Sequence, residues 1–410
     1  MLKKYKFYFL LLLIASSWLL FFSFVIQLKM NFLLEGDEPG YFQAAQKLYS
    51  SFRLDDGRPL LIAAINGFPL LFGLKIDWLN YWIFLINVFS WLATAFFIFD
   101  IVATNFNKKA GFFLALIYIF CVGNLAITFK VLSESVFIMF LIFGIFLTNK
   151  YLLSRNYKFL SVAISIFFLA SLIKPIALGM GFILTFIFIK NLKLIFINKY
   201  SIFIFLSIGL VFFQMNTLKK EYGNFTISYI DGFTYYNYLG TRADCLKNNT
   251  KFIQGKNPRF LYLSKFNHVE QKKIVLSDFK NQLFNNTFYL IKAYFINILS
   301  NSTHGSPVIT NCQNKNKTNY FDFFKVLFKV LSKIQNIIYT TIGLSLSLYC
   351  LKNYQSFNKL LFLISALQLY LFLLSAISSN QGDRLHLVLF PLTILLLMPF
   401  LLKFNNRFYS

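Results

Sequence analysis

The sequence predicts an all-α integral membrane protein with about ten transmembrane helices, and three observations support this fold class. Of the 410 residues, 57% are hydrophobic and only 13% are charged, which is about half the charged fraction of soluble domains. The 55 phenylalanines are too many for a surface that faces water and suit one that faces lipid. The hydrophobic residues also gather in runs that approach the ~20 helical residues needed to cross ~30 Å of hydrocarbon.

The expected membrane helices follow from these apolar runs, taken in chain order. They lie at 6–28, 79–103, 110–129, 131–149, 159–177, 178–196, 200–215, 334–351, 359–378 and 385–402. The fifth and sixth meet near Lys174-Pro175, where a tight hairpin fits. A further apolar run at 59–74 is short and interrupted by proline and glycine, which predicts an interfacial or re-entrant helix. The first run lacks a small-residue cleavage site, so we expect a retained anchor rather than a signal peptide.

Basic residues predict the orientation of these helices. Every second short loop is basic: Lys3, Lys4 and Lys6, then Lys108 and Lys109, then Lys150, Arg155 and Lys158, then Lys190, Lys193 and Lys199, then Lys352 and Lys359, then Lys403 and Arg407. The positive-inside rule places all these loops and both termini in the cytoplasm. We expect a multi-pass protein of a bacterial inner membrane, with the lipid bilayer as a partner. The net charge of +25 then reflects orientation, and nucleic acid is not an expected partner.

This arrangement of helices divides the chain into three parts. They are an N-terminal transmembrane half, 1–215, which includes a first outer loop, 29–78; a large outer loop, 216–333; and C-terminal transmembrane helices, 334–410. We expect no large soluble domain at the C-terminus. The large loop is rich in Asn, Lys and Tyr with weak periodicity, and it is the only candidate for a soluble subdomain.

The large loop also contains two of the four cysteines, Cys245 and Cys312. In an oxidising compartment they are candidates for a disulfide, and two unpaired thiols are the alternative. No Cys/His spacing indicates a zinc site, because the three histidines are far apart in the sequence. We therefore predict neither a metal site nor a cofactor, and leave a divalent cation open.

The most informative stretch is the acidic segment at 35–38, directly after the first helix, where three of the chain's 15 acids lie within four residues. Asp37 and Tyr41 are four residues apart, so they would share one face of a helix at 40–52. One interpretation is that Asp37 or Glu38 caps this helix, with a proline in the first turn. Capping uses a single carboxylate, so the adjacent pair favours a catalytic or ligand-binding role.

Four more charged residues lie at the outer ends of the predicted helices. Arg58, in an Asp-Asp-Gly-Arg-Pro turn, is either solvated or faces an anionic lipid head group. Glu134 and Lys174 are costly at bilayer depth unless they are paired or face water, and snorkelling is the alternative for the lysine. Arg384 either pairs with Asp383 or holds a phosphate, for which its forked donors are suited.

At these residues the sequence resembles the C-type (GT-C) glycosyltransferases, and within them the protein O-mannosyltransferase and aminoarabinose (lipid A) transferase branch. That branch has an Asp-Glu-x-x-Tyr pattern after the first helix, an Arg/Lys-Pro-Pro-Leu run, a Ser-Glu pair, an Arg-Pro pair and a late Arg-Tyr element followed by proline. The corresponding segments here are 37–41, 58–61, Ser133-Glu134, Lys174-Pro175 and 384–391. This chain departs from the pattern in its single proline after Arg58, in lysine at 174 and in the missing aromatic after Arg384.

The resemblance implies a GT-C-like fold and inverting transfer of a sugar from a polyprenyl-phosphate donor to an acceptor hydroxyl on a glycan, lipid or protein at the outer face. The catalytic residues would be Asp37, as the general base, and Glu38, which with Glu134 would support the geometry of the acceptor or the base. The substrate-binding residues would be Tyr41, Arg58, Glu134, Lys174 and Arg384, whose cations would neutralise the departing phosphate. The alternatives are a transporter or flippase for lipid-linked sugars and an O-antigen-type ligase or polymerase. The absence of internal repeats and the gathering of charge at one face favour the transferase.

Overall fold

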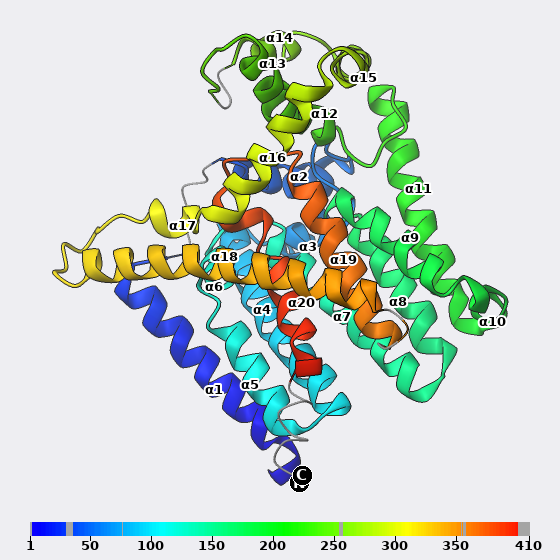
Figure 1. Ribbon diagram of the computed structural model, residues 1–410, viewed down its shortest axis with the longest axis vertical. Coiled ribbons are helices and arrows are strands. Elements are labelled where there is room, and N and C mark those ends of the chain that lie inside the picture. The colour runs from blue at the N-terminus through cyan, green and yellow to red at the C-terminus, as the bar shows by residue number, and fades with distance from the viewer. Residues whose placement is uncertain are drawn as a thin grey trace.

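The computed structural model describes residues 2–29, 36–75, 77–253, 257–353, 355 and 358–400, and all regular structure in these ranges is helical (Figure 1). Glu35, the first acid of the acidic segment, lies outside the described residues, as do Lys403 and Arg407.

Five described helices are long and apolar enough to cross a membrane: α1 (Leu2–Val25), α4 (Trp78–Asn105), α7 (Glu134–Ser154), α11 (Ile202–Tyr222) and α18 (Phe321–Lys352). Two more candidates are bent, by 61° between α5 (Lys108–Ile119) and α6 with η2 (Val122–Phe129), and by 68° between η3 with α9 (Pro175–Ile187) and η4 with α10 (Ile189–Ile197). Among the described residues this makes five spans, or up to seven if each bent pair is one span. The chain is a multi-pass membrane protein, and the expected count of ten is not confirmed.

Several predicted runs form helices too short to span a membrane alone. They are α8 (Tyr157–Ala170), α19 (Lys359–Ser375) and α20 (Leu389–Leu396). The apolar run at 59–74 forms α3 (Leu60–Gly67) and η1 (Phe68–Phe72), which are also short, as expected. For these runs composition overestimated helix length, because it does not show where a neighbouring side chain satisfies a broken backbone. For α18 it underestimated the length, because that helix begins at Phe321, inside the expected outer loop.

The break between α5 and α6 shows this effect. The predicted helix at 110–129 stops near Phe120, where Gln335 of α18 makes two hydrogen bonds to the interrupted backbone. Its side-chain oxygen accepts from Val122 N at 2.9 Å, and its nitrogen donates to Phe120 O at 2.9 Å. A membrane helix can break only where its freed backbone groups find such partners.

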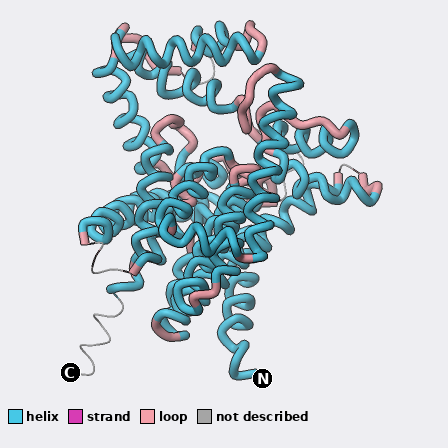
Figure 2. Tube along the Cα trace, turned by 90° about the vertical axis from the view of Figure 1, so that its right-hand side faces the viewer, coloured by secondary structure: helices cyan, strands magenta, loops and turns pink. Residues whose placement is uncertain are grey.

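Most of the large loop expected at 216–333 is helical. α12 (Ile230–Tyr235), η6 (Tyr236–Gly240), α13 (Thr241–Lys247), α14 (Pro258–Leu263) and α15 (His268–Asn285) gather at one end of the molecule (Figures 1 and 2). We call these helices the cap. Tyr235, Leu239 and Val275 form part of its apolar core, and Arg259 pairs with Asp244 and Asp278 to join α13, α14 and α15.

Two helices connect the cap to the bundle: α16 (Thr287–Thr303), which runs down from the cap, and the short α17 (Pro307–Thr310). The main apolar core lies in the bundle below, with Trp91, Tyr118, Phe167 and Phe390 among its largest buried side chains. α1 begins at the end of the molecule opposite the cap (Figure 1). The remaining described elements are α2 (Glu38–Ser51), η5 (Lys199–Ser201) and η7 (Gly382–Leu385). Of these, α2 lies below α16, where the cap meets the bundle (Figure 1), and η7 packs against α16.

Candidate active site beneath the cap

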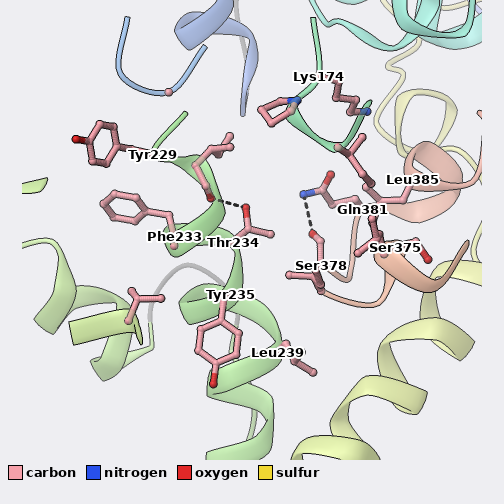
Figure 3. A pocket seen from close by; sticks show the side chains of 18 of the residues that line it. Lys174, Tyr229, Phe233, Thr234, Tyr235, Leu239, Ser375, Ser378, Gln381 and Leu385 are labelled. Atoms are coloured by element: carbon pink, nitrogen blue, oxygen red, sulfur yellow. Dashed lines mark hydrogen bonds between the residues drawn. The ribbon is translucent and has the colours of Figure 1, made fainter. Parts of the chain in front are cut away.

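A cavity of about 970 Å³ lies between the cap and the bundle. Residues far apart in the sequence line it together: Asp37, Tyr41, Arg58, Glu134, Lys174 and Arg384. Cap and α16 side chains add an apolar wall, which includes Val275, Leu276, Phe279, Leu283, Ile291 and Phe295. Figure 3 shows Thr234 of the cap across from Ser378 and Gln381, with Lys174 beyond them. The cavity therefore combines a charged cluster with an extended apolar surface.

Asp37 lies between two arginines at the start of α2. Its Oδ2 accepts from Arg384 Nη1 at 2.6 Å and its Oδ1 from Arg58 Nη2 at 3.3 Å. It occupies the N-cap position of α2, but its side chain makes no capping hydrogen bond, so the capping interpretation is wrong for this carboxylate. Burial raises the pKa of Asp37, but the charges of Arg384 and Arg58 outweigh it and hold the pKa below its ordinary value. The carboxylate stays ionised, and its side chain is still 39% exposed to the cavity.

Glu134, the first residue of α7, holds two cations with one oxygen. Its Oε1 accepts from Arg384 Nε at 2.7 Å and from Lys174 Nζ at 3.0 Å, while the side chain is only 3% exposed. Its Oε2 has no hydrogen-bond partner among the described residues. Buried charges are tolerated when they are paired in this way. Arg384 thus bridges the two carboxylates, and their charges raise its pKa despite burial.

Arg384 does not pair with its neighbour Asp383, which was one of the two expected possibilities. The Asp383 side chain is buried beside Gly123 of α6, and neither of its oxygens has a hydrogen-bond partner in the described ranges. Burial raises the pKa of Asp383 to about 8. Gly382 has a φ of +61°, a conformation that glycine adopts without strain. Asp383 and Arg384 follow it as consecutive residues of the 3₁₀ helix η7, and consecutive residues of such a helix, with three residues per turn, point to different sides.

Arg58 and Tyr41 form the side of the cluster nearest the first outer loop. The Arg58 guanidinium lies over the Tyr41 ring, 4.3 Å from its centroid, a cation–π geometry. The Tyr41 hydroxyl is 2.9 Å from Ser133 Oγ, next to Glu134. The expected turn is present as well, because Asp55 Oδ1 accepts from Arg58 N at 2.8 Å. Arg58 therefore leaves a regular turn and points into the cavity.

Lys174 lies in the turn between α8 and α9, and its pairing with Glu134 replaces the snorkelling interpretation. Glu38 is the exception among the expected site residues, because it is not among the described residues that line the cavity. Its Oε1 accepts from Val131 N at 3.0 Å, and its Oε2 is 3.4 Å from Lys130 Nζ. Glu38 thus holds the segment before α7, whereas Asp37 lines the cavity. A catalytic role for Glu38 stays a prediction.

The candidate disulfide between Cys245 and Cys312 is not formed, and both thiols are free. Cys245 lies in α13 of the cap, with Sγ 3.9 Å from Lys251 O. Cys312 follows α17, and its buried thiol donates to Val308 O at 3.1 Å. Cys245 belongs to the cap, whereas Cys312 lies outside it, after α17. The sequence placed both in one large loop and could not show this separation. In the described ranges no three His, Cys, Asp or Glu side chains gather as a metal site would require.

Several cavity residues were not predicted from the sequence. Gln381 and Ser378 come from the turn before η7, Thr234 comes from the cap, and Lys272 comes from α15. A helical period was the available signal for α15, since positions 272, 275, 276, 279 and 283 share one face. Lys272 has no ion pair among the described residues. With it, the described lining of the cavity contains four Lys and Arg side chains and two carboxylates. The cluster carries excess positive charge.

No family model and no curated protein matches the chain. Among solved structures it is similar to the crystal structure of ArnT from Cupriavidus metallidurans bound to undecaprenyl phosphate, with 12% identity, a TM-score of 0.43, and coverage of 96% of this chain and 77% of that chain. It is also similar to the apo state of the same protein, with 12% identity, a TM-score of 0.40, and coverage of 95% and 76%. Both matches are distant structural similarities to ArnT.

Proposed function

We propose that the protein is a membrane glycosyltransferase that moves a sugar from a polyprenyl-phosphate donor to an acceptor hydroxyl, with inversion at the anomeric carbon. The observation that carries this proposal is a half-exposed carboxylate, Asp37, bound by Arg58 and Arg384 in a cavity with a long apolar wall. A base and preset cations next to an apolar surface fit an amphiphilic phosphate donor.

The charge of the cavity supports a phosphate as its ligand. Among the described lining residues, Arg58, Lys174, Lys272 and Arg384 outnumber the carboxylates Asp37 and Glu134. Guanidinium groups match the oxygens of a phosphate in pairs, which favours arginine at such sites. The apolar side chains of α15 and α16 that line the same cavity would contact the hydrocarbon chain of the donor.

The arrangement also explains how Asp37 can serve as a base although its pKa is held low. A donor phosphate would compete with Asp37 for Arg58 and Arg384, the two cations that lower the pKa of this carboxyl. Once these cations turn to the phosphate, the proton affinity of the Asp37 carboxylate rises. The base would therefore become effective when the donor is bound, and it would stay ionised and ready in its absence.

In the proposed reaction Asp37 takes the proton of the acceptor hydroxyl. The acceptor oxygen attacks the anomeric carbon as the bond from that carbon to the phosphate oxygen breaks. The polyprenyl phosphate leaves with both bonding electrons and one more negative charge than it carried in the donor. Arg58, Lys174 and Arg384 stabilise that growing charge.

The other expected residues act by position. Glu134 holds Arg384 and Lys174 in place, and Tyr41 supports Arg58. Glu38 orders the segment before Glu134, which makes it a positioning residue. We place the cap and the reaction on the non-cytoplasmic face of a bacterial inner membrane, because alternate short loops are basic, and the acceptor would be a glycan, a lipid or a protein.

The test compares Asp37→Asn with Asp322→Asn, which changes an exposed acid at the start of α18. Both variants are reconstituted and supplied with a panel of radiolabelled polyprenyl-phosphate sugars and membrane extract as acceptor. We expect D37N to lose transfer by about 10² to 10⁴-fold, the range of general base catalysis, and D322N to retain it. Full transfer by D37N would remove the base assignment. Movement of labelled lipid between leaflets without a new glycosidic bond would favour the transporter.

A further inference from the structure

Helix α16 presents a polar stripe to the end of α19. Tyr294, Asn297 and Asn301 are spaced so that they fall on one face of the helix. Asn297 and Asn301 are 0% and 1% exposed, and such buried amides are costly unless they are hydrogen-bonded. Neither asparagine is among the described residues that line the cavity. Their burial therefore needs an explanation other than direct contact with a ligand.

The stripe binds the carbonyl groups at the C-terminal end of α19. Tyr294 donates its hydroxyl to Leu373 O at 2.7 Å, and Asn297 Nδ2 donates to Ala376 O at 2.8 Å. Asn301 Nδ2 donates to two carbonyls, Ser375 O and Ser378 O, each at 2.9 Å. The last carbonyls of a helix have no partner within the helix. Backbone amides of the turn reach two of these carbonyls at long distances, with Ala376 N 3.4 Å from Leu373 O and Ser378 N 3.3 Å from Ser375 O. The neighbouring helix α16 adds shorter hydrogen bonds from its side chains.

The turn that these bonds hold leads directly to Arg384. Other contacts to the same turn also come from the side of the cap: Arg242 Nη2 donates to Ser379 Oγ at 3.1 Å, and Gln381 Nε2 donates to the Tyr238 hydroxyl at 3.0 Å. Beyond α16, Gly305 O accepts from Asp383 N at 3.3 Å. The cap and α16 thus hold the turn that precedes Arg384, while Asp37 and Glu134 hold its side chain.

We propose that Asn301, assisted by Asn297, is a positioning residue for Arg384, and that α16 thereby couples the cap to the cationic centre. This inference rests on the proposed function, in which Arg384 contacts the donor phosphate. Arg384 must reach Asp37 and Glu134 at the same time, with distances of 2.6 and 2.7 Å. A turn freed from α16 would lose that placement although Asn297 and Asn301 themselves do not line the cavity.

The central experiment uses Asn301→Asp, which keeps the side-chain volume and replaces the donor amide by an oxygen facing two carbonyl oxygens. The control is Asn285→Asp, the same chemical change at an exposed residue of α15. Hydrogen exchange of the full-length protein in detergent reports on the segment 376–386. We expect faster exchange there in N301D and unchanged exchange in N285D, because only the former releases the turn. Unchanged exchange in N301D would overturn the inference, whatever the protein does.

A double-mutant cycle then separates a specific effect on Arg384 from general damage. The probe is undecaprenyl phosphate, with undecaprenol as the matched lipid without phosphate. We expect N301D to weaken undecaprenyl phosphate binding about tenfold, and to add less than about twofold when Arg384 is already alanine, because coupled residues are not additive. Equal losses in both backgrounds would show a merely structural role and overturn the coupling to Arg384.

Two outcomes distinguish this inference from the proposed function. If R384A binds undecaprenyl phosphate as well as the unchanged protein, the proposed phosphate site is wrong, and hydrogen exchange still decides whether Asn301 holds the turn. If N301D fails to fold, Asn297→Asp, which removes a single hydrogen bond, is taken through the same measurements. For that variant too, unchanged hydrogen exchange in the segment 376–386 would contradict the inference. An equal loss of undecaprenyl phosphate binding with and without Arg384 would also contradict it.

Discussion

At the scale of single residues, two carboxylates hold three of the cations of the site in place. Asp37 is shared by Arg58 and Arg384, and Glu134 by Arg384 and Lys174. Each substitution therefore changes the state of a neighbour as well as removing a group. The first two predictions at this scale use that dependence, the third concerns a cavity cation outside these pairs, and each has a control residue of the same type elsewhere in the chain.

The first prediction concerns the pKa of Asp37. Arg58 is one of the two cations that lower it, so Arg58→Gln should raise the pKa of this carboxyl. A carboxyl group with a lowered pKa is in its base form at any pH above the folded pKa. Its contribution to stability is complete above the unfolded pKa and is lost as the pH falls through the folded pKa. In the pH profile of kcat/KM, the acidic limb should move to higher pH in R58Q and stay in place in R53Q, which changes an exposed arginine. If the acidic limb does not move in R58Q, the ionisation of Asp37 is not what produces it.

The second prediction concerns the stability that Glu134 provides. Glu134→Gln would leave Arg384 and Lys174 without the buried carboxylate oxygen that both now contact. Breaking a buried ion pair on one side costs roughly 3–5 kcal/mol, so the thermal unfolding midpoint of the detergent-solubilised protein should fall clearly. The exposed Glu221→Gln should leave it nearly unchanged. Equal midpoints would mean that the two cations find other partners.

The third prediction concerns Lys272, the cavity cation without a described ion pair. Lys272→Glu should weaken the binding of undecaprenyl phosphate by about tenfold, because removing one cation and adding an anion next to a phosphate costs on the order of 1 kcal/mol in a partly solvated site. Lys273→Glu, one residue away on the exposed side of α15, is the control. Equal affinities in the two variants would place the phosphate away from the cap.

At the scale of elements, helices end where a neighbour supplies backbone partners. Gln335 does this at the break between α5 and α6, and Asn297 with Asn301 at the end of α19. Hydropathy does not reveal such ends, because the residues that permit them lie on other helices. Asn301 also begins an Asn-x-Ser/Thr sequence, yet its side chain is buried, so this match marks a packing position.

The break can be tested by Gln335→Leu. This change removes both hydrogen bonds to the interrupted backbone, which should lower the free energy of unfolding by about 1–3 kcal/mol for the groups left without partners. Gln313→Leu changes an exposed glutamine and should have little effect. The measurement is thermal or denaturant unfolding in the same detergent. An unchanged stability in Q335L would mean that water or lipid head groups replace the glutamine.

At the scale of the whole molecule, the cap and the bundle meet around the cavity, and charge asymmetry predicts which side of the membrane the cap faces. The proposed orientation places the cap outside and the basic loops inside. In a background without native cysteines, Asn248→Cys in the exposed part of the cap should react with a membrane-impermeant maleimide in intact cells. Arg155→Cys, in the exposed loop before α8, should react only after permeabilisation. The reverse pattern would place the cavity on the cytoplasmic face.

Much of the site could be predicted because its residues interrupt apolar runs. Asp37, Glu134, Lys174 and Arg384 stand out for this reason, and the structure places all four at one cavity. The sequence could not distinguish the positions of Glu38 and Asp37, because adjacent carboxylates have the same chemistry. Their side chains point in different directions, and this is known only from the structure. Gln381 and Thr234 could not be recognised, because neutral polar residues in an Asn-rich segment carry no distinctive pattern.

The sequence by itself determined that the chain belongs in a membrane and which charged residues lie at the ends of its helices. Both follow from local composition, since long apolar runs are costly in water and isolated charges are costly inside the hydrocarbon. Only the tertiary structure decided the pairing of Arg384 with Asp37 and Glu134 instead of Asp383, the separation of Cys245 from Cys312, and the true ends of the helices. These depend on contacts between segments distant in the chain, which local composition does not encode.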